Sequence, residues 1–200
     1  MIYIREYNCS DIPRKEKKKS ETAYGRELLK TALHNEYGLN LDELTITTGE
    51  YGKPYFSDRE DIFFNISHSD GLVTVILADT PVGIDIQSIR PIKDRMIEMI
   101  CGFGEQELIK KSREKDEVFI RLWSLKESYI KAIGKGMSFS MKNVNFDIDL
   151  LDKEKFTGKI SNQSGVFFTK QLENYMLSAC VLDEGIDKQQ LDKIFTVNRV

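Results

Sequence analysis

The sequence contains few cysteines and histidines. Cys9, Cys101 and Cys180 are widely spaced and none belongs to a CxxC pair, so the sequence offers neither a zinc site nor a disulfide framework and fits a reducing, cytoplasmic compartment. His34 and His68 are the two histidines, which excludes a multi-histidine metal site. A bound divalent ion would therefore be held mainly by oxygen, and this favours Mg²⁺ or Mn²⁺ over zinc.

Long apolar runs and flexible linkers are also missing. No apolar stretch approaches the roughly 20 residues that span a bilayer, and the start, MIYIREYNCS, has an early charge pair instead of a long apolar core. We therefore expect neither a membrane segment nor a secretory signal. A net charge of −3 and a pI of about 5.6 argue against a nucleic-acid binder. The 200 residues describe a globular chain.

Hydrophobic periodicity predicts an α+β fold. The helices are expected at residues 19–33, 93–99 and 105–115, with a central one that ends at 136. Expected strands cover residues 2–7, 44–48, 62–67, 72–78, 82–87, 144–148, 156–160, 166–171 and 175–182. Asp70-Gly71, between two of the clearest strands, is a strong hairpin signal.

Two stretches of the chain resemble each other without a gap. Phe63-Phe64 precedes an apolar strand that ends before Asp79, and Phe167-Phe168 precedes another that ends before Asp183. This predicts two similar α/β lobes in a pseudo-twofold arrangement, with residues 1–100 in one lobe and 101–200 in the other. No Gly/Ser-rich linker separates them, so we expect one compact unit.

The stretch from Trp123 to Gly136, WSLKESYIKAIGKG, is typical of an amphipathic helix with a sharp end at two glycines. Its apolar residues recur at three- and four-residue steps, while Trp123, Glu127 and Lys131 follow one another on a different face. On spacing alone, Glu127 and Lys131 could be an ordinary surface ion pair.

Asp85 lies in the strand-like stretch VGIDIQ. Alternation directs Asp85 and Gln87 to one face of that strand, with oxygen-bearing side chains that can both reach one hard cation. A carboxylate in so apolar a strand is costly to bury unless it is paired or bound to metal. The alternative is an edge strand whose second face lies in water.

Three further residues lie in turns or at a strand end. Ser67-His68 ends the strand FNISH, where a scaffold commonly presents functional groups, although a lone histidine there is more often structural. Lys53, within YGKPYF, suits contact with a phosphate or with plain solvent. AIGKGMS lacks the spacing of a phosphate-binding loop, which argues against a nucleoside triphosphatase.

In their order, EYGKPYF, FNISHS, VGIDI and WSLKESYIKAIGKG closely resemble the motifs of the 4'-phosphopantetheinyl transferases, in their two-lobed, surfactin-synthetase-activating (Sfp-type) branch. The resemblance implies that family's fold and a monomer, because the second lobe replaces a partner subunit. It implies transfer of the 4'-phosphopantetheine arm of coenzyme A to a serine of an acyl or peptidyl carrier protein, with release of adenosine 3',5'-bisphosphate.

The resemblance also implies roles for the matching residues. Asp85 and Glu127 would coordinate Mg²⁺ at the pyrophosphate, and Glu127 is either a metal ligand or the base that takes the serine proton. Lys131 would hold the phosphates and assist the leaving group. The family usually has a second carboxylate where this chain has Gln87, whose amide oxygen can still coordinate the metal, directly or through water.

For the adenosine end of coenzyme A, the resemblance implies Lys53, Ser67 and His68 near the 3'-phosphate and, more loosely, Thr22 near the adenine.

The carrier surface is expected within residues 97–115, where Lys110, Lys111 and Arg113 could steer an acidic partner; the alternative is a solvated helix face. Two rival functions stay open: an inactive relative that binds coenzyme A or a carrier, and a structural α+β protein.

Overall fold

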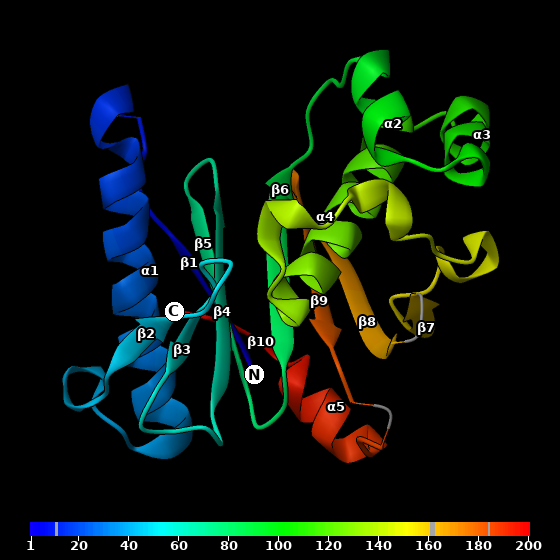
Figure 1. Cartoon of the computed structure of the whole chain (residues 1–200). Helices are drawn as coiled ribbons and strands as arrows, with labels where there is room; N and C mark the ends of the chain where they lie inside the picture. Colours follow the sequence, from blue (N-terminus) through cyan, green and yellow to red (C-terminus); the bar gives the residue numbers. More distant parts are fainter. Residues whose placement is uncertain (11, 161–162, 184) are drawn as a thin grey trace.

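The computed structural model describes residues 1–10, 12–160, 163–183 and 185–200. Two four-stranded sheets of similar size lie side by side, each packed with helices (Figure 1). The first has the order β10 (Val197–Arg199), β1 (Ile2–Glu6), β5 (Leu72–Ala78), β4 (Phe63–Ser69). The second has the order β6 (Val82–Ser88), β9 (Tyr175–Val181), β8 (Gln163–Leu172), β7 (Lys155–Ile160). A separate hairpin joins β2 (Ile46–Thr48) to β3 (Pro54–Phe56).

Helices cover the outer faces of the two sheets. α1 (Arg14–Tyr37) packs on β5 and β4, and α4 (Lys115–Ile133) packs on β6 and β9. The shorter helices are α2 (Asp94–Ile100), α3 (Phe103–Lys111) and α5 (Lys188–Ile194). Single 3₁₀ turns are η1 (Leu41–Glu43), η2 (Gly136–Ser138), η3 (Met141–Asn143) and η4 (Ile148–Leu150). None of the helices in the described part of the chain is both long and apolar enough to cross a bilayer.

The sheets face each other across an apolar layer. Alternation along β6 directs Ile84 and Ile86 into this layer, where they meet residues of β1, β5, β8, β9 and α5. Two further cores lie outside it, one beneath α1 and one beneath α4. The order is therefore helix, sheet, sheet, helix, which confirms the predicted α+β class with two similar lobes.

Each lobe contains a β-hairpin where the internal similarity predicts one. The first hairpin turns at Asp70 (φ 40°) and Gly71 (φ 92°), the left-handed pair that such a turn needs. The second turns at Glu173-Asn174, with Leu172 paired to Tyr175. An ungapped correspondence would put that turn one residue later, so the similarity extends to the elements and not to their pairing register.

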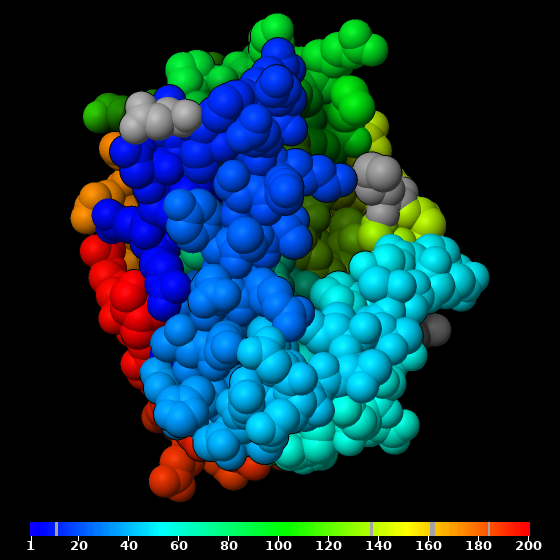
Figure 2. All heavy atoms as spheres, turned by 90° about the vertical axis from the view of Figure 1, so that its left-hand side faces the viewer, coloured from blue at the N-terminus to red at the C-terminus, as the bar shows by residue number. Residues whose placement is uncertain are grey.

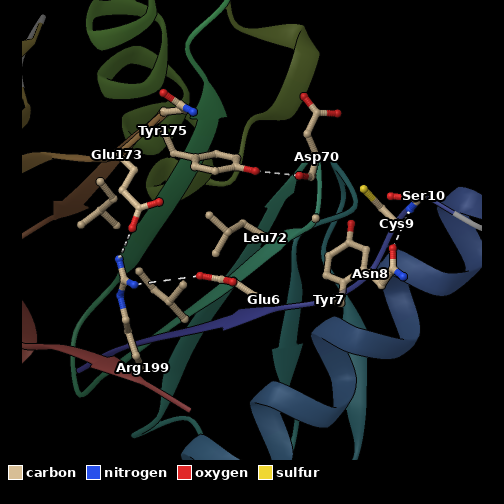
Figure 3. Close-up of a pocket in the computed structure, with 14 residues that line it drawn as sticks. Glu6, Tyr7, Asn8, Cys9, Ser10, Asp70, Leu72, Glu173, Tyr175 and Arg199 are labelled. Atoms are coloured by element: carbon tan, nitrogen blue, oxygen red, sulfur yellow. Dashed lines mark hydrogen bonds and ion pairs between the residues drawn. The ribbon is translucent and has the colours of Figure 1, made fainter.

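The sheets exchange one strand each. β6 lies in the first hundred residues but joins the second sheet, and β10 ends the chain but joins the first. The Tyr175 hydroxyl of the second sheet also donates to the Asp70 carbonyl of the first lobe, at 2.7 Å (Figure 3). The division at residue 100 stays a prediction.

Several predicted boundaries are wrong. The first long helix begins at Arg14 instead of residue 19, because the charged run RKEKKK forms its first turns. Residues 144–148 form no strand: they connect η3 to the start of η4, and their alternation arises because Val144 and Phe146 are buried while Asn145 is exposed. The helix predicted at 105–115 is α3, which ends at Lys111, while Lys115 already begins α4.

Candidate active site

Asp85 is almost fully buried, yet both of its carboxylate oxygens accept hydrogen bonds. Its Oδ1 accepts from the Lys131 ammonium at 2.6 Å and from the Ser67 hydroxyl at 3.0 Å. Its Oδ2 accepts from the Gln87 amide nitrogen at 3.0 Å. β6 directs this side chain away from the apolar layer and toward α4, as the alternation predicts. Asp85 is therefore paired, as one alternative from the sequence holds. β6 is indeed the edge strand of its sheet, but its second face lies against α4 and not in water.

The side chains of β4 hold β6 in place. Asn65, Ser67 and Ser69 accept hydrogen bonds from the backbone N–H groups of every second residue of β6, at 2.9, 3.3 and 3.1 Å. The donors are Ile84, Ile86 and Ser88. The two strands belong to different sheets, so these side chains form the seam between the lobes. Asp85 lies in the middle of that seam.

α4 approaches β6 unusually closely at Gly83. A Cβ atom there would lie 2.0 Å from the Ser128 carbonyl oxygen and 2.4 Å from the Ala132 nitrogen. Only a glycine fits between the two backbones. This contact brings Lys131, on the last turn of α4, within hydrogen-bond distance of Asp85.

Glu127 lies one helical turn before Lys131. Burial is the largest effect that raises the pKa of its carboxyl above the ordinary value, and the neighbouring Asp85 charge raises it further. Lys131 acts in the opposite direction. The site therefore holds two carboxylates that repel each other and one lysine that pairs with Asp85, an arrangement that an added cation would stabilise.

Two cavities border this cluster and share Lys131 and Gly136. One, of about 340 Å³, is lined by Glu127 together with Ile130, Phe139 and Met141. The other, of about 200 Å³, is lined by Tyr51, Gly52, Lys53, Pro54, Asn65 and Gly134. Figure 2 shows this face of the molecule hollowed between α1 and the segment that carries β2 and β3. Lys131 can therefore be reached from both cavities.

The residues predicted for the adenosine end are spread more widely. Ser67 and His68 point to opposite faces of β4, which strand alternation implies: His68 is exposed, with Nδ1 3.4 Å from Glu21 of α1. The Thr22 hydroxyl, exposed on α1, donates to the Lys18 carbonyl at 2.9 Å. The Lys53 ammonium donates to two backbone carbonyls instead of facing solvent.

An oxygen-only set of donors at this point suits a hard divalent ion. The set consists of two carboxylates, Asp85 and Glu127, and the amide of Gln87. The described residues contain no larger cluster, that is, no group of three or more His, Cys, Asp or Glu side chains that could hold a metal. The Gln87 nitrogen donates to Asp85, so its oxygen would reach a shared cation only after the amide turned over. The donor chemistry thus fits Mg²⁺ with few protein ligands and several waters.

Sequence reasoning missed a second lysine on α4. Lys126 is fully buried, and its ammonium donates to Glu105 at 2.6 Å, to the Ile100 carbonyl at 3.1 Å and to the Met141 carbonyl at 3.3 Å. The signal was present, because Lys126 stands four residues after Leu122 on the apolar stripe of the helix. A lysine on such a stripe needs a buried partner.

Comparison with known proteins identifies the family of this chain. The family model of the 4'-phosphopantetheinyl transferase superfamily matches residues 81–180, the range that holds Asp85, Glu127 and Lys131. The chain is 30% identical over 164 residues to 4'-phosphopantetheinyl transferase Sfp of Bacillus subtilis (strain 168), covering 80% of this chain and 72% of the relative. It is 28% identical over 194 residues to the transferase gsp of Aneurinibacillus migulanus, covering 96% and 78%.

The chain therefore belongs to the 4'-phosphopantetheinyl transferase superfamily, and it is an enzyme of that class. Its similarity to Sfp and gsp over most of its length confirms the Sfp-type resemblance inferred from the sequence. Among solved structures, the holo-[acyl-carrier-protein] synthase of Thermotoga maritima matches with a TM-score of 0.38 and 17% identity, over 58% of this chain and 75% of that one.

Proposed function

We propose that Asp85, Glu127 and Lys131 form the centre at which this chain transfers 4'-phosphopantetheine from coenzyme A to a serine of a carrier protein. The observation that carries the proposal is the buried Asp85 carboxylate, bound by Lys131 and flanked by Glu127 at the edge of an open cavity. The serine oxygen attacks the phosphorus that bears the pantetheine arm. The bond from that phosphorus to the bridging oxygen breaks, and adenosine 3',5'-bisphosphate leaves.

Charge neutralisation is the main requirement of such a transfer. Mg²⁺, which Asp85 and Glu127 would hold with Gln87 beside them, supplies this neutralisation at the pyrophosphate when it is bound. Lys131 contributes a fixed positive charge where the leaving phosphate gains negative charge. Asp85 orients that ammonium, because the two groups lie 2.6 Å apart.

Glu127 has the environment of a base or a metal ligand. Burial raises the pKa of its carboxyl, which makes it a better proton acceptor than an exposed glutamate. It borders the cavity next to Lys131, where an incoming serine would be near both groups. Both roles require the ionised carboxylate, so activity should rise as the pH passes above its pKa.

The adenosine end of coenzyme A would extend over β4 and α1. His68 is exposed there beside Glu21, and we keep it, with Ser67 and Thr22, as proposed neighbours of the 3'-phosphate and the adenine. The Ser67 hydroxyl already binds Asp85 and Lys131. It therefore links the coenzyme site to the reaction centre.

The carrier would approach over α2 and α3. Phe103 and Met99 are large exposed apolar side chains of these two helices, and Lys110, Lys111 and Arg113 are exposed cations at and after the end of α3. An acidic carrier surface complements such a mixture, because charges steer the encounter and apolar contacts hold it. We also propose that the enzyme is a monomer and that it acts in the cytoplasm.

The direct test is mass spectrometry of an apo carrier protein incubated with coenzyme A, Mg²⁺ and this enzyme. A gain of one phosphopantetheine is expected, and Glu127→Ala should abolish it. Glu154→Ala is a matched control, because Glu154 only pairs with exposed Lys170 at 3.7 Å. No gain with several carriers, despite measurable binding of coenzyme A, would favour an inactive binding protein; failure to bind coenzyme A as well would leave a structural role.

A further inference from the structure

Lys53 joins the two elements that carry the reaction centre. From the connection between β2 and β3, its ammonium donates to the carbonyl oxygens of Val82 and Ala132, both at 2.9 Å. Val82 begins β6 and is three residues before Asp85; Ala132 follows Lys131 directly in α4. A single side chain thus bridges the strand of the buried carboxylate and the helix of its lysine partner.

The surrounding chain is shaped to admit this lysine. Gly134 ends α4 with a left-handed backbone (φ 69°), and an added Cβ there would lie 3.3 Å from the Lys53 Cδ atom. Ala132 belongs to the last turn of α4, where carbonyl groups lack partners within the helix and a cation is favourable. Burial lowers the pKa of Lys53 to about 8, so the two carbonyls compensate only part of its lost hydration.

We propose that Lys53 is a positioning residue that fixes α4 against β6 and thereby keeps Lys131 and Glu127 in register with Asp85. The proposal rests on the function proposed above. It replaces the role that the family resemblance implied for Lys53, contact with the 3'-phosphate of coenzyme A. The two roles have different consequences for coenzyme A and for 3'-dephospho-coenzyme A, which lacks that phosphate.

The experiment compares wild type with Lys53→Met, which keeps an unbranched side chain one atom shorter and removes both hydrogen bonds. Steady-state kcat and KM are measured with coenzyme A and with 3'-dephospho-coenzyme A, well below the melting temperature of each protein. A displaced α4 should lower kcat at least tenfold with both substrates, because small misplacements of reacting groups are costly. The ratio of the two KM values should stay that of wild type, and Lys53→Arg should restore part of kcat.

Three results would overturn the proposal. A loss confined to coenzyme A, seen in its KM, would mean that Lys53 binds the 3'-phosphate. A lower melting temperature with unchanged kcat would mean that Lys53 only stabilises the fold. His68→Gln is the matched control, since a 3'-phosphate contact should affect coenzyme A alone. If wild type itself transfers nothing, the proposed function fails, whereas an active wild type with a normal Lys53→Met variant rejects only the positioning role.

Discussion

α4 carries two lysine–carboxylate pairs that look alike in chemistry and differ in access to water. Lys126–Glu105 and Lys131–Asp85 both have a nitrogen–oxygen distance of 2.6 Å. The side chains of the first pair are 0% and 3% exposed, and those of the second 26% and 3%. The carboxylates are equally buried, so the difference lies in the lysines.

That difference separates a structural pair from the pair that we propose to serve the chemistry. We call Lys126–Glu105 the sealed pair and Lys131–Asp85 the open pair. Lys126 fills its remaining hydrogen bonds with the Ile100 and Met141 carbonyls, so it ties α2, α3 and η3 to the helix and cannot receive a ligand. Among the described residues, the Lys131 ammonium donates to two side chains of the seam, Ser67 and Asp85, and it borders two cavities. An ion pair of the same length can therefore stabilise the fold or serve the chemistry, depending on whether its cation reaches water.

The largest effect is expected from breaking the sealed pair. Lys126→Met should lower the free energy of unfolding by about 3–5 kcal/mol, because Glu105 is left as a buried, unpaired charge. Urea unfolding measures the loss. The double variant Lys126→Met/Glu105→Gln should recover a large part of it, and a single variant as stable as wild type would show that the pair is not needed.

Breaking the open pair should affect catalysis more than stability. Lys131→Met is expected to lower kcat/KM by about 10²–10³-fold through loss of the charge opposite the leaving group. Its melting temperature should fall less than that of Lys126→Met, because Asp85 keeps the Ser67 and Gln87 hydrogen bonds. Equal melting temperatures for the two variants would contradict the distinction between the pairs.

Gly83→Ala should break the open pair and leave the sealed pair intact. The new methyl group has to push α4 away from β6, which moves Lys131 away from Asp85. Lys126 binds α2, α3 and η3 instead of β6, so its ion pair with Glu105 should remain. Overpacking of this kind costs about 3 kcal/mol at the upper end of its usual range, and activity should fall with it. Gly49→Ala is the control, since its Cβ would make only an ordinary contact at 3.6 Å. A normal Gly83→Ala enzyme would refute the close approach.

The smallest effect concerns the open pair alone. Gln87→Glu adds a carboxylate beside Asp85 and should lower the Mg²⁺ concentration for half-maximal activity about tenfold or less, because charge strengthens the binding of hard cations. Titration of activity with Mg²⁺ gives the value. An unchanged Mg²⁺ requirement would place Gln87 outside the coordination sphere.

The sequence predicted those parts of the site that depend on local pattern. Alternation in VGIDIQ oriented Asp85 correctly, and the Asp70-Gly71 turn was recognised by its chemistry. The same alternation separates Ser67 from His68, although both were assigned to one side of the coenzyme. The strand prediction for residues 144–148 was wrong because alternate burial also occurs in an irregular segment that packs on a core.

The remaining features depend on contacts between distant segments. The pairing of Asp85 with Lys131 requires α4 to approach β6 closely at Gly83. The local sequence around a glycine does not show which helix will pack against it. The burial of Lys126 depends on hydrogen bonds to Glu105, Ile100 and Met141. Helical periodicity does not predict that these three residues lie close to Lys126. Lys53 looked like a free cation in a turn for the same reason.

The seam between β4 and β6 has a consequence for how the two halves can change over time. A backbone ladder survives almost any substitution, since each residue except proline contributes the same groups. Here Asn65, Ser67 and Ser69 make the joint with their side chains. One codon change can therefore strengthen or weaken this joint, which makes it an accessible place for selection, or an engineer, to adjust how the two lobes meet.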